Sequence, residues 1–532
     1  MPKSTLPTVA PHPFNQSSAD LTLRTPDCVN FHVHSHILSQ ASPVFADMLS
    51  LPQPSSLSQD ANAARPIVDV TEDSKTLGRL LCLCYPIEKE KLDELKDIVP
   101  VLQAAMKYDM KWPISLLTTD LLAIVPRSPL KVWAVACRCG LEALAQEAAS
   151  RILRKAKGQS DSQPQRTSPE PPLALLKTMV EEHGKHILHG ISAADYFRLR
   201  EYLRAGDETA TTKLLSPTIL PPKAPAYQPP PLNPTIPHFP PPDITLRCSE
   251  GTEYRVHALF LILHSPTLGE RVGATNDVSS SPETQTTTTG NDIHLPPLEV
   301  DIDPPTLSTL LAVLYGGNDQ LPSDLHSLGS ALVAARKFGM AQVTKAAEGR
   351  WDSLAASSPL EAYFVAIEHG LADYARFAAR KVLEGPVAGA YVRAMESGTA
   401  LAYHHLLEYY RACARTIDAR MKAAVVPWSQ DLNNIEYGYR NSNYCPGTLQ
   451  NPTYIANTYL TGLATTMDTD VPGTGCSFEF TLPALLRASS STWPNCTATI
   501  CQGYTEVLMN ISASLPQVVA DAIAEVQLEM IE

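Results

Sequence analysis

Residues 20–25 read Asp-Leu-Thr-Leu-Arg-Thr, and residues 30–43 read Asn-Phe-His-Val-His-Ser-His-Ile-Leu-Ser-Gln-Ala-Ser-Pro. The pattern returns in residues 243–248, Asp-Ile-Thr-Leu-Arg-Cys, and in residues 253–266, Glu-Tyr-Arg-Val-His-Ala-Leu-Phe-Leu-Ile-Leu-His-Ser-Pro. At a constant offset of 223, six residues of the first copy correspond to six of the second: Asp20, Phe31, Val33, His34, Ser42 and Pro43 match Asp243, Tyr254, Val256, His257, Ser265 and Pro266. An internal repeat of this kind indicates a duplicated domain.

The correspondence continues farther along the chain, although the offset changes. Lys107-Tyr-Asp-Met pairs with Lys337-Phe-Gly-Met at offset 230, and Glu201-Tyr-Leu-Arg-Ala pairs with Glu408-Tyr-Tyr-Arg-Ala at offset 207. Stretches that agree in the same order are hard to obtain by chance. A repeat of roughly 190 residues is far longer than a solenoid unit, so a whole domain with an extension has been copied.

Each copy is predicted to begin with strands and to continue with helices. Residues 21–24 and 30–34 alternate apolar and polar side chains, as half-buried strands do. Pro43 can open a helix because its missing N–H costs nothing in the first turn. Residues 66–70 are a third expected strand, and helical periodicity then extends to Leu153. The predicted fold class is therefore α+β.

Two strands, a helical hairpin, a third strand and further helices describe the BTB/POZ fold, and the residues resemble that family. The resemblance is carried by Asp20-Leu-Thr-Leu, Phe31-His-Val-His, Ala41-Ser-Pro-Val-Phe and Ala105-Met-Lys-Tyr. The second copy departs from the pattern, because it reads Leu263-His-Ser-Pro where the first copy reads Ser39-Gln-Ala-Ser-Pro. The tandem layout also resembles that of BTB proteins from mushroom-type fungi, the basidiomycetes.

This resemblance and the composition together predict six segments. They are a BTB/POZ domain at 19–125, a helical extension at 126–206, a Pro-rich linker at 207–242, a divergent BTB/POZ domain at 243–350 with a Ser/Thr-rich insert at 275–291, a second helical extension at 351–420, and an acidic C-terminal region at 421–532 that ends in two helices, 504–511 and 516–531. The prolines of the linker favour an extended, semi-rigid tether.

Composition and charge exclude several classes of function. The net charge is −13, and no basic stripe is present, so nucleic-acid binding is not expected. No apolar run of 18 residues occurs, which predicts no membrane association, and prolines interrupt residues 1–14 where a signal peptide needs an apolar stretch. The 11 cysteines form no disulfide framework. We therefore expect an intracellular protein of the cytoplasm, the nucleus or both.

Three histidines, His32, His34 and His36, alternate along an expected strand, where two rings could share a face as metal ligands do. No second ligand cluster accompanies them, so we predict a structural role in which the His34 ring bonds backbone groups at the strand–helix junction. Asp20 and Asp243, at strand starts, are expected to cap local turns.

Other candidate chemical groups also favour structural roles. His183, His186 and His189 are interrupted by glycines that predict a broken helix, and the Cys82/Cys84 and Cys137/Cys139 pairs diverge on helices. Four thiols in the C-terminal region lack the paired spacing of a zinc ribbon, so zinc is the minor alternative there. No phosphate-binding loop or catalytic motif occurs. The predictions are that the protein is not an enzyme and needs no cofactor.

The BTB/POZ resemblance implies self-association and docking of protein partners. It places dimerisation on the first strand and the helical hairpin, here Leu21, Leu23, Phe45, Met48 and Leu49. The alternative for the last three is that they are core residues of a domain of about 105 residues.

Three functions follow from the resemblance. The first is an interaction scaffold, in which the two copies could also pair with each other because the tether raises their effective concentration. The second is a substrate adaptor of a cullin-type ubiquitin ligase, for which Leu92 and Glu94 match a short hydrophobic-x-Glu motif loosely. The third is a transcription-associated co-regulator; a tetramerisation module is a further alternative.

Overall fold

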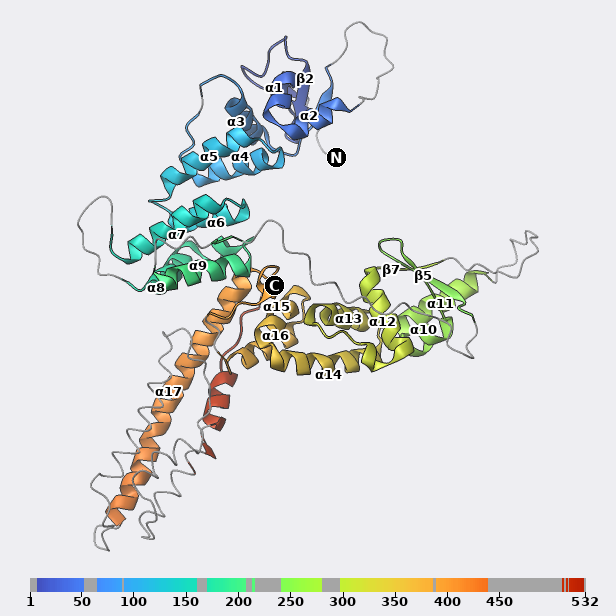
Figure 1. Cartoon of the computed structure of the whole chain (residues 1–532), viewed down its shortest axis with the longest axis vertical. Coiled ribbons are helices and arrows are strands. Elements are labelled where there is room, and N and C mark those ends of the chain that lie inside the picture. Colours follow the sequence, from blue (N-terminus) through green and yellow to red (C-terminus); the bar gives the residue numbers. More distant parts are fainter. Residues whose placement is uncertain are drawn as a thin grey trace. The chain divides into compact units, whose positions relative to one another are not determined.

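A computed structural model describes residues 7–51, 65–88, 90–159, 170–206, 213–215, 241–279, 297–385, 389–438, 510, 513–514 and 516–530 (Figure 1). The chain divides into two compact units. The first comprises residues 1–191 and 195–218, and the second comprises residues 192–194 and 219–532. Each unit is described by itself below.

The first unit opens with a small mixed sheet. Its strands are β1 (Thr8–Val9), β2 (Leu21–Arg24), β3 (Val29–Val33) and β4 (Ile67–Asp69), in the order β1-β3-β2-β4. β2 and β3 are antiparallel, with Leu21 opposite Val33 and Leu23 opposite Phe31. β1 is parallel to β3 and β4 is parallel to β2. Leu21, Leu23, Phe31 and Val33 are buried as predicted, but Thr22 is buried too, so β2 is covered on both faces rather than half-buried.

A helical hairpin follows the sheet, formed by α1 (Ser35–Ala41) and α2 (Pro43–Ser50). After β4 comes α3 (Ser74–Cys84), and the side chain of Asp73 caps it by accepting a hydrogen bond from the Thr76 N–H at 2.7 Å.

Helices make up the rest of the first unit (Figure 1). They are α4 (Leu95–Lys107), α5 (Lys111–Ile124), α6 (Pro129–Arg138), α7 (Glu142–Ala156), α8 (Pro172–His183), the short 3₁₀ helix η1 (Lys185–Leu188) and α9 (Ala193–Ala205). Trp133 and Tyr196 are buried in their core. The predicted break among the three histidines is confirmed, because α8 ends before Gly184, whose φ of +82° no helix accepts.

The second unit repeats this plan with one strand fewer among its described residues. The sheet order is β6-β5-β7, from β5 (Ile244–Cys248), β6 (Glu253–Val256) and β7 (Leu298–Val300). Its helices are α10 (Ala258–His264), α11 (Pro266–Ser279), α12 (Pro304–Gly316), η2 (Asn318–Gln320), α13 (Leu325–Lys337), α14 (Ala341–Ser357), α15 (Pro359–Glu368), α16 (Ala372–Val382), η3 (Arg393–Met395) and α17 (Ala400–Gly438). Two copies of one mixed architecture confirm the predicted α+β class.

The last described residues lie against α17. Residues 516–524 are mostly helical, and Val519, Ala522 and Leu528 are buried. Arg420 of α17 forms an ion pair with Glu525. The predicted terminal helix is thus present over part of its length. The Ser/Thr-rich insert, the linker and the expected helix at 504–511 lie largely outside the described residues.

Candidate protein interface

The first strand of each sheet is tied to the helical hairpin by an aspartate. Asp20 accepts hydrogen bonds from the N–H and the hydroxyl of Ser35, at 2.7 and 2.5 Å, and Asp243 accepts one from the Ala258 N–H at 2.7 Å. Each carboxylate therefore satisfies a free N–H at the start of the next helix. This corrects the expectation of a local turn, because the bonded residues lie 15 positions apart.

A tyrosine hydroxyl holds the histidine that precedes each hairpin. The Tyr85 hydroxyl accepts a hydrogen bond from the His34 N–H at 2.9 Å, and Tyr315 does the same for His257 at 3.0 Å. The His34 ring lies 3.1 Å from the Ser18 hydroxyl and 3.4 Å from that of Tyr85. The junction position was predicted correctly, but this ring bonds hydroxyls rather than backbone groups.

A serine links the hairpin to the helices behind it. Ser42 donates to the Tyr108 carbonyl at 2.5 Å and accepts from the Phe45 N–H at 3.1 Å, so it caps α2. Ser265 repeats both bonds with the Phe338 carbonyl and the Leu268 N–H. Pro43 and Pro266 then occupy the first turn of their helices. The two copies share one hydrogen-bonded framework.

The outer surface of the hairpin differs sharply between the copies. On α10, Leu259, Ile262 and Leu263 are 61, 50 and 68% exposed, and they follow helical spacing along one face. We call these three residues the α10 stripe. At offset 223 the residues of α1 are polar: His36, Ser39 and Gln40. The buried leucine between them, Leu38 or Leu261, is the same in both.

The model of one family matches both copies. The description of that family is BTB/POZ domain, and the matched residues are 12–123 and 240–352. The chain contains two BTB/POZ domains. A search of curated proteins gave no match. BTB/POZ domains act as protein-interaction and dimerisation modules, so the predicted class of function is supported, and we refer to BTB domain 1 and BTB domain 2 below. The likeness to basidiomycete proteins stays a prediction.

The expected interface of BTB domain 1 requires correction. Leu21, Leu23 and Phe45 are buried, and the Phe45 ring stacks on Tyr108 at 4.6 Å between centroids. They belong to the core because β2 is covered on both faces of the sheet and Phe45 faces inward from α2. Met48 and Leu49 are half-buried, so the core alternative describes them in part. Sequence reasoning missed the α10 stripe because it searched the first copy.

Besides Val44 of α2, BTB domain 1 carries exposed apolar side chains on α4 and α5. Met106, Trp112 and Leu122 are 36, 63 and 41% exposed. At offset 230, BTB domain 2 has Arg336, Gln342 and Asp352 in their places. The two domains therefore expose apolar surface at non-equivalent positions, which is typical of copies that no longer share one partner.

The predicted cullin contact is only partly accessible. Leu92 is buried, whereas the Glu94 side chain is 62% exposed and pairs with Lys96 at 2.5 Å. Leu92 lines a cleft of BTB domain 1 together with residues of α3 and the N-terminal segment. A partner at this site would meet Glu94 but not Leu92.

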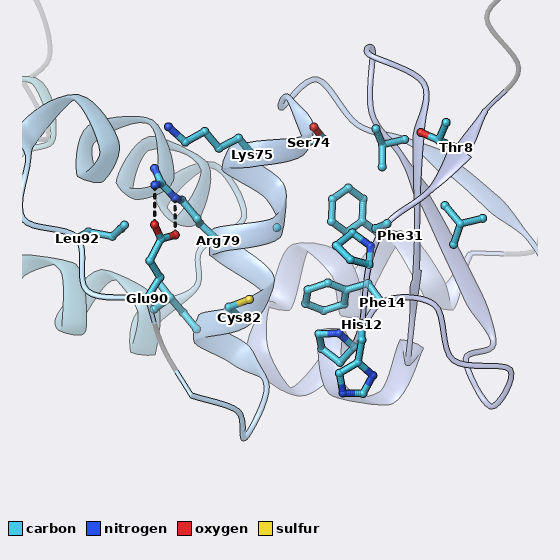
Figure 2. A pocket seen from close by; sticks show the side chains of 17 residues that line it. Thr8, His12, Phe14, Phe31, Ser74, Lys75, Arg79, Cys82, Glu90 and Leu92 are labelled. Carbon is cyan, nitrogen blue, oxygen red and sulfur yellow. Dashed lines mark hydrogen bonds and ion pairs between the residues drawn. The ribbon is translucent and has the colours of Figure 1, made fainter.

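That cleft has a volume of about 590 Å³, and Figure 2 shows Phe31 and Phe14 on one side and the Arg79–Glu90 pair on the other. Arg79 donates two hydrogen bonds to Glu90, both at 3.0 Å, and a third to Asp97 at 2.6 Å. These bonds raise the pKa of the Arg79 guanidinium and keep its charge satisfied within the domain. The cleft thus has an apolar wall and a neutralised polar wall.

Within the described ranges, no group of three or more histidine, cysteine or acidic residues is arranged to hold a metal ion. In the same ranges, no helix is both long enough and apolar enough to cross a bilayer.

Proposed function

We propose that the protein is a protein–protein interaction scaffold that self-associates through the α10 stripe of BTB domain 2. The proposal rests on the exposure of Leu259, Ile262 and Leu263 on one short helix. Contiguous exposed apolar side chains on a folded domain are typical of an interface. A two-fold axis beside α10 would bring the two stripes of two chains together and remove all six side chains from water.

The energetics favour a reversible contact. Burying a leucine or isoleucine side chain fully contributes about 1.5–3 kcal/mol, and these are about half to two-thirds exposed at the outset. Association itself costs on the order of 4–15 kcal/mol. The dimer should therefore depend on concentration.

Pairing of the two BTB domains within one chain is less favourable at this face. It would place the α10 stripe against His36, Ser39 and Gln40, so apolar side chains would cover polar ones without new hydrogen bonds. We therefore favour association between chains over the tethered pairing, which stays a prediction.

Light scattering on the full chain tests the proposal. The chain has a mass of 57.8 kDa, and the native protein should show a mass that rises towards twice this value with concentration. The variant L259H/I262S/L263Q, which carries the residues of BTB domain 1, should stay monomeric. V333Q is the matched control, because Val333 is exposed on α13 and the corresponding residue of BTB domain 1 is Gln103. A native monomer at every concentration, or a triple variant that still dimerises, would contradict the proposal.

The adaptor and co-regulator functions stay predictions. Because Leu92 is buried, the adaptor hypothesis now depends on Glu94. Co-purification of a cullin with the native chain, weakened in E94K, would support it.

A further inference from the structure

The outer edge of the sheet differs between the two domains. In BTB domain 1, the N-terminal segment covers the edge of β3: the N–H groups of Thr8 and Ala10 donate to the carbonyls of Cys28 and Asn30, and the His32 N–H donates to the Phe14 carbonyl, all at 2.9 Å. In BTB domain 2, β6 is the edge strand, and no described strand pairs with its outer side.

The groups that would accept such a strand are in place on β6 and in the turn before it. At offset 223 they are the carbonyls of Gly251 and Glu253 and the N–H of Arg255, and all three residues are exposed. The Cys248 N–H donates a hydrogen bond to the Thr252 carbonyl. In an antiparallel pair the backbone groups of alternate residues point the same way, so those of 252, 254 and 256 point towards β5, whereas those of 253 and 255 point away from the sheet. An edge with such groups readily pairs with another strand.

The aromatic side chains under this edge are also less covered than their counterparts. In BTB domain 1, Phe14 lies 5.7 Å from Phe31 and 5.3 Å from Tyr85 between ring centroids, and all three are buried. In BTB domain 2, the corresponding Tyr254 and Tyr315 are only half-buried. Phe260 of α10 stacks on Tyr315 at 4.7 Å between ring centroids, but no described aromatic ring packs on Tyr254 as Phe14 packs on Phe31.

The sequence supplies a segment that matches the one in BTB domain 1. Residues 7–14 read Pro-Thr-Val-Ala-Pro-His-Pro-Phe, and residues 234–239, which lie outside the described residues, read Pro-Thr-Ile-Pro-His-Phe. Both contain Pro-Thr followed by a β-branched residue, then Pro-His and a phenylalanine. The second segment lacks the equivalent of Ala10, so one of the three hydrogen bonds would be lost.

We propose that residues 234–239 are the missing edge strand of BTB domain 2 and dock on β6 of their own chain. Thr235 donates to the Gly251 carbonyl, the Arg255 N–H donates to the Phe239 carbonyl, and the Phe239 ring covers Tyr254. The chain between the proposed strand and β5 is long enough. It must cross two strand spacings, about 10 Å, and the four residues from Phe239 to Asp243 can extend to about 13–14 Å. Part of the Pro-rich linker then belongs to the domain.

Amide hydrogen exchange on the full chain tests this docking. In the native protein the Arg255 amide should be protected, as His32 is expected to be in BTB domain 1. In T235G/I236G/F239S its exchange should rise by at least about tenfold, while the amides of His32 and Tyr254 keep their rates. A226G/Y227G, which alters the same linker outside the segment, is the control and should leave Arg255 protected.

Three outcomes would overturn the proposal. The first is an Arg255 amide that exchanges freely in the native protein. The second is protection of this amide that survives the triple variant. The third is protection that depends on protein concentration or on residues 7–10, because the strand on β6 would then come from another chain or from the N-terminal segment. A cross-link gives a second measurement that does not need the triple variant to fold. I236C with E253C should form an intramolecular disulfide, because paired Cα atoms lie within bonding range, whereas A226C with E253C should not. Failure of I236C/E253C to cross-link counts against the proposal.

Discussion

The Tyr85 hydroxyl accepts a hydrogen bond from the backbone N–H of His34, 51 residues earlier in the chain, at 2.9 Å. Tyr315 and His257 repeat the bond at 3.0 Å in BTB domain 2. Burial raises the pKa of both phenols, so they stay protonated and neutral at physiological pH. The bond fixes α3 or α12 against the start of the hairpin.

We expect Y85F to destabilise BTB domain 1 by about 1–3 kcal/mol, because the half-buried His34 N–H loses its acceptor. Y315F should act likewise on BTB domain 2. Chemical denaturation of each variant measures the effect. Y391F is the control: Tyr391 is exposed and its hydroxyl bonds Glu396 at the surface, so the change should stay within about 0.5 kcal/mol. Equal stability of Y85F and the native chain would contradict this account.

Two helical glycines of BTB domain 2 should respond in opposite ways to alanine. A Cβ at Gly329 of α13 would lie 2.6 Å from Cδ2 of His369, so G329A should destabilise by about 1–3 kcal/mol. A Cβ at Gly349 of α14 meets nothing within 4 Å, so G349A should stabilise by about 0.4–1 kcal/mol. The denaturation midpoints of G329A and G349A, compared with that of the native chain, measure the direction of each change in stability. Shifts of both midpoints in the same direction would contradict the packing argument.

The ion pairs of Asp97 predict an acid-dependent stability. Hydrogen bonds from Arg79 and Lys75 lower the pKa of Asp97 from 3.8 to about 2. The folded form binds the proton less tightly than the unfolded form, so the stabilisation is complete above pH 4 and is lost as the pH falls towards 2. In D97N the denaturation midpoint should therefore change less with pH across this window. D93N, at an exposed neighbour that pairs with Lys91, should keep the native pH dependence.

Grafting the α10 stripe onto BTB domain 1 should create a second self-association site. In H36L/S39I/Q40L each chain would present two apolar stripes, so chains could link into assemblies larger than a dimer. Light scattering should give a mean mass above that of the native protein at equal concentration. The variant H36A/S39A/Q40A tests whether loss of the polar groups alone changes the mean mass. Masses identical to the native protein would show that three side chains do not make an interface.

The sequence alone was enough to predict the duplicated α+β architecture because its signals are local. The strand at 21–24 and the helix that opens at Pro43 depend on neighbouring residues, and both are present. The strand is not half-buried as the alternation predicted, because Thr22 is buried as well. β1 was not predicted. It is a two-residue strand whose pairing with β3 depends on hydrogen bonds formed 20 positions away, and the prolines on either side of it are not typical of a strand.

The candidate interface was harder to predict, because periodicity reports which residues share a face but not which face is covered. Leu21 and Phe45 are as apolar as Leu259 and Leu263, yet only the latter pair is exposed. The signal was present in the comparison of the copies: Leu259, Ile262 and Leu263 replace three polar residues around an identical leucine. Apolar residues that differ between copies around a shared buried position are better candidates for contacts than apolar residues that both copies keep.

The divergence between α1 and α10 has a genetic consequence. Duplicated domains are commonly redundant, so that loss of function in one is compensated by the other. Here the exposed leucines and isoleucine of BTB domain 2 correspond to polar residues of BTB domain 1, and no aromatic residue of BTB domain 2 corresponds to Trp112. Lesions in the two halves should therefore give different phenotypes, and two chains damaged in opposite halves should complement each other only when both are expressed in the same cell.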